Sequence, residues 1–129
     1  MFLSECKSKG KWKFADCKCV RKDRKKGVGG GIAFCIAPEF REYCVERTCS
    51  IPGVLVLEVK LKVARSDGGS KALLLIGVYI PPEGTPSKRG QSERSAIMTS
   101  LPLLVKKICE EDAEVMLIGD PNARVADFR

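Results

Sequence analysis

The sequence predicts an α/β domain whose mixed sheet contains a βαβ crossover. Three observations indicate this class: apolar and charged residues alternate in 57–63, an apolar run fills 72–80, and a helical segment at 91–111 leads into a third apolar run at 115–118. With 129 residues, of which 44% are apolar, the chain has the size and composition of one globular domain.

The first expected strand follows a run of glycines. The apolar segment 32–37 comes directly after Gly31 and ends before Pro38, and a short apolar run with such borders is typical of a strand. The next candidate is 54–63, in which apolar residues at 57, 59, 61 and 63 alternate with charged residues at 58, 60 and 62. This period of two predicts a strand with one buried face and one face in solvent.

A turn and a second long strand come next. The sequence SDGGS at 66–70 predicts a turn, and the run 72–80 that follows it is apolar on both faces. A strand of this kind is typical of the centre of a sheet that is covered on two sides. Pro81 marks its end.

The segment 91–111 has apolar residues at helical spacing and polar residues on the opposite side. Pro102 interrupts this pattern, so we expect either a kink or two short helices, the second of them capped by Ser100. The run 115–118 then predicts a buried strand, which continues directly into the sequence GDPN.

A strand, a helix and a strand in succession predict that 72–80 and 115–119 are parallel if they share a sheet. Tyr79 ends the first strand, and Asp120 and Asn122 follow the second, so we expect the three side chains in one crevice at the carboxyl edge. Asp-Pro-x-Asn also favours a simple turn, because Asp and Asn side chains bond their own backbone. A tyrosine in this place can equally be a core aromatic.

Positive charge is concentrated at the start of the chain. The net charge is +7, and the first 31 residues account for all of the excess, with ten basic and three acidic side chains. We divide the chain into a basic head, 1–26, for which disorder is one interpretation, and a domain over 27–129. The head is suited to phosphate contacts, with DNA as the expected partner, although it could also be a solvated tail or a nuclear localisation patch. The expected nucleic-acid-binding residues are Lys22, Arg24, Lys25 and Lys26.

Composition also bears on location and on metal binding. No apolar run approaches the roughly 20 residues that span a bilayer, and lysines interrupt the start where a secretory signal needs apolar residues. We therefore expect an intracellular protein, nuclear or cytoplasmic, that makes no membrane contact and keeps its seven cysteines reduced. Cys17 and Cys19 form a C-x-C pair, but the cysteine spacing fits no common zinc pattern and the chain has no histidine.

Three segments occur in a characteristic order: GVGGGIAFCI, LLLIGVYIPP and, after a helix, VMLIGDPNAR. Together they resemble the middle part of the endonuclease/exonuclease/phosphatase superfamily, and in detail the endonuclease domain of LINE-type (non-LTR) retrotransposon reverse transcriptases. The resemblance covers about residues 20–129, and its most specific elements are the V-Y-x-P-P and G-D-x-N-A runs. It implies a partial four-layer α/β sandwich, in which helices flank two packed sheets.

The resemblance also implies metal-dependent hydrolysis of phosphodiesters, with DNA as substrate. In the family, the aspartate of G-D-x-N orients or deprotonates the attacking water, and the asparagine helps to hold the phosphate; these roles would fall on Asp120 and Asn122. The tyrosine of the Y-x-P strand end helps to bind the phosphate, and Tyr79 matches it. The implied cofactor is Mg²⁺, a hard cation that prefers oxygen ligands and neutralises charge on phosphoryl oxygens.

The chain departs from the family pattern in three places. The family's main metal ligand is an early glutamate, and Glu5 stands in surroundings that do not match. A C-terminal S-D-H is absent, and Pro121 replaces a bulky apolar residue and biases Asp120 toward an extended backbone. We therefore expect an incomplete hydrolase site. The alternatives are a catalytically inactive nucleic-acid-binding fragment of a retrotransposon protein and, less favoured by the charge, a small-molecule or lipid phosphatase of the same superfamily.

Overall fold

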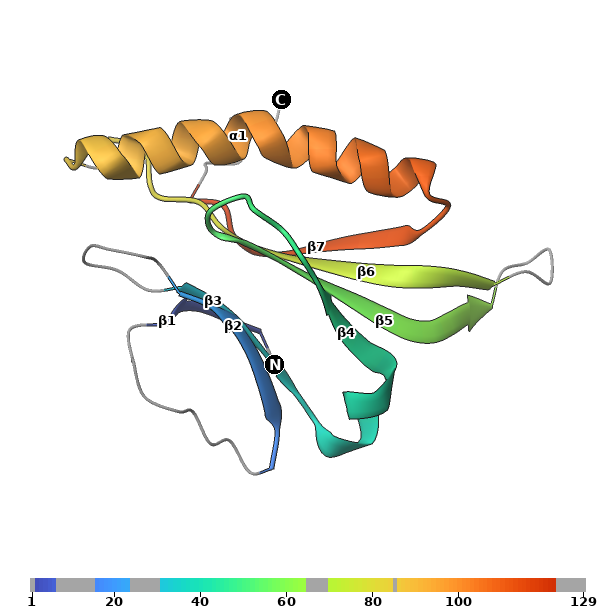
Figure 1. The fold of residues 1–129 in the computed structure, drawn as a ribbon. Helices are drawn as coiled ribbons and strands as arrows, with labels where there is room; N and C mark the ends of the chain where they lie inside the picture. The colour runs from blue at the N-terminus through green and yellow to red at the C-terminus, as the bar shows by residue number, and fades with distance from the viewer. Residues whose placement is uncertain (1, 7–15, 24–30, 65–69, 85, 123–129) are drawn as a thin grey trace.

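The computed structural model describes residues 2–6, 16–23, 31–64, 70–84 and 86–122. These residues form three layers, in which a long helix lies on one face of a four-stranded sheet and a three-stranded sheet packs against the other face (Figure 1). The α/β class and the mixed sheet predicted from the sequence are thus confirmed.

The four-stranded sheet has the order β4-β5-β6-β7. Its strands are β4 (Cys44–Arg47), β5 (Val54–Ala64), β6 (Ser70–Tyr79) and β7 (Glu114–Asp120). Neighbouring strands are antiparallel from β4 to β6, whereas β7 runs parallel to β6. The expected parallel crossover is therefore present, with α1 as the connection between β6 and β7.

The three-stranded sheet has the order β1-β3-β2, and both pairs are antiparallel. Its strands are β1 (Phe2–Cys6), β2 (Lys18–Lys22) and β3 (Gly31–Ile36). Two of these strands belong to the basic head, so the described part of the head shares a sheet with β3. A 3-10 helix, η1 (Pro38–Tyr43), then leads from β3 into β4 of the other sheet.

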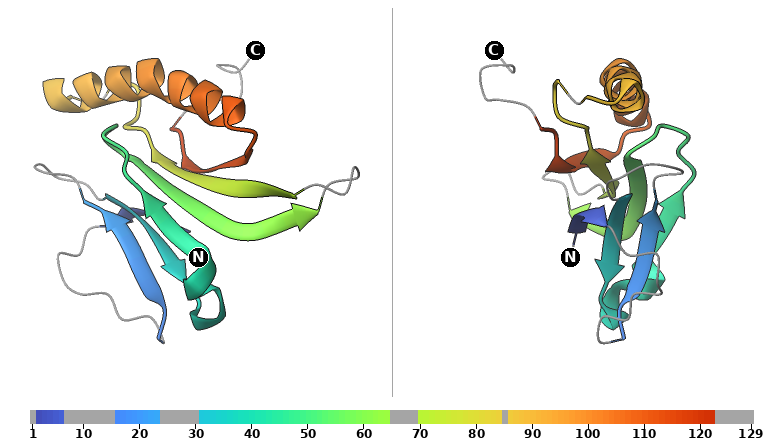
Figure 2. Two further views of the ribbon diagram at one scale, coloured as in Figure 1. Left: turned by 45° about the vertical axis from the view of Figure 1, so that its right-hand side comes forward. Right: turned by 90° about the vertical axis from the view of Figure 1, so that its left-hand side faces the viewer.

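Figure 2 shows the three layers from two further sides. Two apolar cores, one on each side of the four-stranded sheet, hold these layers together. Alternate residues of β5 and β6 point into different cores, because successive side chains of a strand point to opposite faces. The core between the two sheets contains Val20, Ile32, Phe34, Ile36, Cys44, Leu55, Leu57, Val59 and Tyr79. The core under the helix contains Val54, Val56, Leu74, Ile76, Val78, Ile80, Ile97 and Ile108.

The strand β5 differs from its expected pattern in its first half. Val54 and Val56 lie under the helix, while Leu55 and Leu57 face the other sheet, so 54–57 is buried on both faces. Farther along, Lys60 is exposed. The expectation of a half-buried strand is therefore wrong for the first half, because it is covered on both sides.

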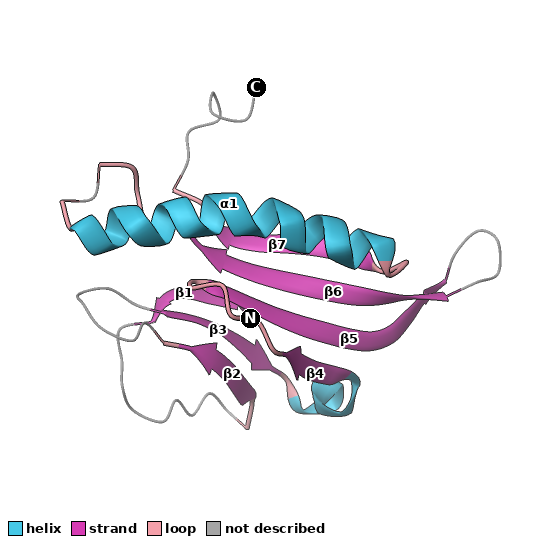
Figure 3. Ribbon diagram, turned by 45° about the horizontal axis from the view of Figure 1, so that its top comes forward, coloured by secondary structure: helices cyan, strands magenta, loops and turns pink. Residues whose placement is uncertain are grey.

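The helix α1 (Lys88–Glu110) is one continuous element, and it lies along the sheet (Figure 3). Ser87 caps it, with its hydroxyl oxygen accepting a hydrogen bond from the backbone N–H of Gly90 at 3.0 Å. Pro102 lies inside the helix, so the expected division into two helices with a second cap at Ser100 is wrong. Pro102 is exposed, and apolar residues on both sides of it, Ile97 and Ile108 among them, are buried against the sheet.

Within the described part of the chain, no helix has the length and apolar character that a membrane crossing requires. The turn expected at 66–70 lies, except for Ser70, outside the described residues.

Candidate active site

The carboxyl ends of β6 and β7 lie side by side at one edge of the four-stranded sheet. Tyr79 and Asp120 are register partners, and each is the last residue of its strand. Register partners on neighbouring strands lie about 4.8 Å apart and point to the same face of the sheet. Tyr79 and Asp120 therefore share both an edge and a face. The face is the one directed toward the three-stranded sheet, because Tyr79 and Ile118 both pack in the core between the sheets.

The GDPN segment forms a turn that bonds back to the end of β6. The backbone N–H of Asn122 donates to Oδ1 of Asp120 at 2.9 Å, and the Asn122 side-chain amide donates to the carbonyl of Ile80 at 2.8 Å. The backbone N–H of Ile80 in turn donates to the carbonyl of Asp120 at 3.0 Å. These bonds fix Asp120 and Asn122 beside the residue that follows Tyr79, and they use the local hydrogen bonding that favours a turn.

Gly119 lets the backbone of β7 lie close to that of β6 just before Asp120. Its φ is +146°, and a Cβ atom built there would lie 1.9 Å from the carbonyl oxygen of Val78. Any side chain larger than hydrogen would therefore displace one of the two strands. The glycine of the GD pair is thus required by the position of the aspartate.

Tyr79 is 7% exposed and belongs both to the core and to the wall of a pocket. Its backbone N–H donates to the carbonyl of Gly53 at 2.8 Å. Gly53 has a φ of +68°, and a Cβ there would lie 2.4 Å from the Tyr79 carbonyl oxygen. The turn at Pro52 and Gly53 is therefore fitted closely against the end of β6.

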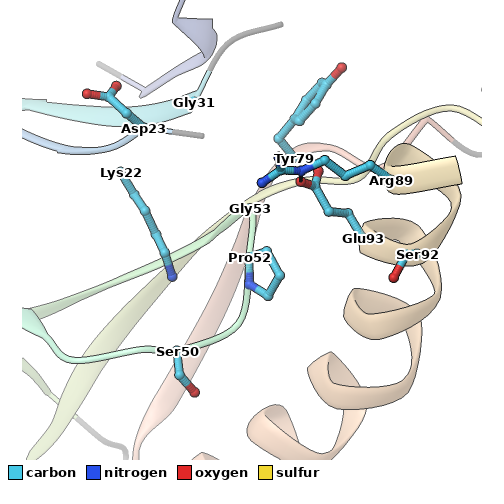
Figure 4. A pocket seen from close by; sticks show the side chains of 10 residues that line it. All are labelled: Lys22, Asp23, Gly31, Ser50, Pro52, Gly53, Tyr79, Arg89, Ser92 and Glu93. Atoms are coloured by element: carbon cyan, nitrogen blue, oxygen red, sulfur yellow. Dashed lines mark hydrogen bonds and ion pairs between the residues drawn. The ribbon is translucent and has the colours of Figure 1, made fainter. Parts of the chain in front are cut away.

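A pocket of about 360 Å³ opens on this side of Tyr79 (Figure 4). Its walls come from the end of β2, the start of β3, the 50–53 segment and the first two turns of α1. Arg89 and Glu93 reach from α1 toward Tyr79, and their side chains pair at 3.3 Å. Asp120 and Asn122 do not line this pocket, so the structure joins them to Tyr79 through the sheet edge rather than through one cavity.

Lys22, an expected nucleic-acid contact, has its ammonium group in a cradle of backbone carbonyls. Its Nζ donates to the carbonyl oxygens of Cys49 and Ile51 at 2.6 Å and to that of Val54 at 3.0 Å. A lysine ammonium has three N–H donors, and these contacts use all three. The side chain thus holds the 49–54 segment in place, while Arg24, Lys25 and Lys26 lie outside the described residues.

The described residues hold no ready-made cluster of metal ligands. Mg²⁺ needs near-octahedral oxygen ligands, usually with one or two carboxylates. Among the described residues, no group of three or more acidic, cysteine or histidine side chains is placed to hold a metal. Asp120 would offer such an ion one carboxylate, and Oδ1 of this carboxylate already accepts a hydrogen bond from the backbone N–H of Asn122.

Sequence reasoning did not single out Gly53 or the pair Arg89 and Glu93. The Pro52-Gly53 dipeptide is a turn signal that marks the segment in the sequence. Nothing local indicates that this turn packs against Tyr79 or receives Lys22, because these contacts join residues 26 to 32 positions apart.

A comparison of the chain with family models gives no match, and comparisons with curated proteins and with solved structures give none either.

Proposed function

We propose that this chain carries the water-activating and phosphate-contacting part of a metal-dependent endonuclease site directed at DNA. The observation that supports the proposal best is the register of β6 and β7, which sets Tyr79 and Asp120 side by side at one sheet edge. The Y-x-P-P and G-D-x-N-A motifs of the resemblance thus come together. The proposal includes the finer architecture, the middle part of a four-layer sandwich from a retrotransposon protein.

Each residue has a chemical task in this proposal. Asp120 would accept the proton of the attacking water, since a carboxylate is a suitable base when it lies within hydrogen-bond reach. Asn122 would offer its second amide proton to a phosphate oxygen, because the first is bound to the Ile80 carbonyl. The Tyr79 hydroxyl would contribute a further phosphate contact. Mg²⁺, which the resemblance implies as cofactor, would neutralise charge on the phosphoryl oxygens when bound.

We expect DNA binding with no detectable cleavage. The carboxylate of Asp120 is engaged by the turn, the chain contains no histidine for the phosphate contact, and each such group is typically worth about 10² to 10³ in rate. The test is nicking of supercoiled plasmid in Mg²⁺, with Asp120→Ala as the matched variant. Mg²⁺-dependent nicking that disappears in Asp120→Ala would show a complete site and overturn the expectation of an incomplete one.

Binding is tested separately, by fluorescence anisotropy of a labelled DNA duplex over a range of salt concentrations. The slope of log affinity against log salt should be reduced by about 0.9 for each phosphate contact removed. We expect this in the triple variant Arg24→Gln, Lys25→Gln, Lys26→Gln. The control changes Lys60, Lys106 and Lys107 to Gln, which lowers the net charge equally. Equal slopes in both variants, or no binding by the parent chain, would contradict the nucleic-acid assignment.

A second candidate is a nucleic-acid-binding fragment without catalysis, and the ten basic against three acidic side chains of the first 31 residues favour it over the phosphatase alternative. Salt-dependent DNA binding that Asp120→Ala leaves unchanged, with no release of phosphate from inositol phosphates, would support this candidate.

A further inference from the structure

Cys19 and Cys35 face each other across two paired strands. They are register partners in the antiparallel pair of β2 and β3, and their sulfur atoms are 3.2 Å apart. Their neighbours Val20 and Phe34, also register partners, point into the core between the sheets. The two thiols therefore lie on the opposite, outer face of the three-stranded sheet.

We propose that Cys19 and Cys35 form a dithiol site that reacts with low-molecular-weight disulfides and closes into a cross-strand disulfide. Directly opposed residues of antiparallel strands have Cα atoms about 4.5 to 5.5 Å apart, which lies within the range of disulfide-bonded cysteines. A sulfur–sulfur bond is about 2.05 Å long, so closure needs the two sulfur atoms to approach by roughly 1 Å. Side-chain rotation suffices for this, with no change of register.

The two cysteines differ in access, which sets the order of the reaction. Cys19 is half-buried, whereas Cys35 is 6% exposed. Burial, aided by the hydrogen bond with Cys19, raises the pKa of the Cys35 thiol to about 11. Since the thiolate is the nucleophile in exchange, Cys19 is the residue that meets the external disulfide first.

The reaction balances as two exchanges. The Cys19 thiolate attacks one sulfur of oxidised glutathione, forms a mixed disulfide and releases one glutathione thiolate. Cys35 then loses its proton to solvent, and its thiolate attacks the Cys19 sulfur, which releases the second glutathione. Two protein thiols are oxidised to one disulfide while one glutathione disulfide is reduced to two thiols, so no other oxidant is needed.

Closure would affect the candidate site through Lys22. This residue lies on β2, and its ammonium group holds the 49–54 segment that packs against Tyr79. A covalent bond between β2 and β3 would keep Lys22 in position even when backbone hydrogen bonds between these strands break.

The experiment uses the full chain, incubated with oxidised glutathione, quenched in acid, alkylated and digested with trypsin. Trypsin cleavage places Cys19 in a peptide of residues 19–21 and Cys35 in one of residues 27–41. Cleavage after Lys18 separates Cys17 from Cys19, so each of the two peptides contains a single cysteine. We expect these two peptides to be found linked, and two of the seven thiols to be lost at this pair. A different pairing, or glutathione on Cys19 without closure, would overturn the proposal.

Two variants make the result specific. Cys35→Ser should stop the reaction at the mixed disulfide on Cys19, because the second nucleophile is gone. Cys109→Ser, at an exposed cysteine of α1, should leave the linked peptide unchanged. Closure that depends on Cys109, or that persists as a Cys19 disulfide to another protein thiol in Cys35→Ser with equal yield, would contradict the assignment.

Discussion

Gly119 shows how one small residue sets the position of a functional neighbour. Its backbone comes so close to the carbonyl of Val78 that there is room only for a hydrogen atom. The close approach brings the next residue, Asp120, level with Tyr79. The glycine of this motif is therefore explained by packing and backbone geometry, without any direct role in chemistry.

The substitution Gly119→Ala should destabilise the protein by about 3 kcal/mol, since it combines a clash with an unfavourable φ. The matched control is Gly84→Ala, where φ is +74° but a Cβ would have no neighbour within 4 Å. That change should cost only about 1 kcal/mol. Urea unfolding of both variants measures the difference, and equal losses would mean that the contact with Val78 relaxes freely.

Lys22 acts through its three carbonyl contacts, so Lys22→Met should lower the free energy of unfolding by about 2 kcal/mol or more. Hydrogen exchange of the amides in 49–53 should accelerate as well. Lys60→Met, at an exposed position of β5, is the control and should change little.

The same variant separates a structural role from a role in binding. We expect Lys22→Met to leave the salt slope of DNA binding unchanged, because its ammonium group already has three partners. A slope reduced by about 0.9 with stability intact would instead identify Lys22 as a phosphate contact.

At the scale of elements, α1 shows that packing can outweigh local preference. A proline within a helix removes one backbone hydrogen bond and costs about 3 kcal/mol. The helix nevertheless continues through Pro102, since apolar residues before and after it are buried on the sheet.

The substitution Pro102→Ala should therefore stabilise the protein by about 1 to 3 kcal/mol, because alanine restores the missing donor at an exposed site. Leu103→Ala is the neighbouring control; Leu103 is 66% exposed, so the change should be near zero. Thermal unfolding followed by circular dichroism compares the two. No gain in Pro102→Ala would show that the backbone there is already bent away from helical bonding.

The elements that could be predicted are those with a strong apolar signal. The strands β3, β5, β6 and β7 each begin and end within two residues of the expected limits. The strands β1, β2 and β4 were not predicted, because their sequences have only four or five residues and show no alternation of apolar and polar side chains. Their pairing is decided by contacts across the sheet, such as Lys22 opposite Ile32, and no local pattern encodes such contacts.

The candidate site was predictable to the same extent. The crossover placed Tyr79 and Asp120 together, since parallel strands share an edge. The fit of Gly53 against Tyr79 and the cradle around Lys22 depend on the packing of one sheet on the other. Residue types and spacing alone do not contain that information.

At the scale of the whole molecule, the four-stranded sheet is the middle one of three layers. The strands β5 and β6 contribute side chains to both cores, so the two cores are joined through the same backbone. Burial raises the pKa values of two thiols, Cys44 in the core between the sheets and Cys35 on the opposite face of the three-stranded sheet. The folded state therefore favours the neutral form of both thiols.

Stability should decline in alkali for this reason. The pKa of Cys35 is about 9 when unfolded and about 11 when folded, so its contribution is complete below pH 9 and is lost as pH rises through 11. Cys35→Ala should show a flatter curve of unfolding free energy between pH 8 and 11 than the parent or Cys109→Ala. Parallel curves for all three would contradict the shift.

The two sheets are connected at two places, which lie at opposite ends of the β2–β3 pair. Covalently they are joined through η1, which follows β3 at Ile36, the end of the strand that lies opposite Lys18. Lys22 lies at the other end of the same strand pair, opposite Ile32. Its ammonium group donates hydrogen bonds to carbonyls of the 49–54 segment, which leads into β5 of the four-stranded sheet. The two sheets are therefore tied at both ends of this strand pair, covalently through η1 and by hydrogen bonds through Lys22, on either side of the apolar core between them. One ammonium group thus ties the three-stranded sheet to the loop before β5, at the end farthest from the covalent connection between the sheets.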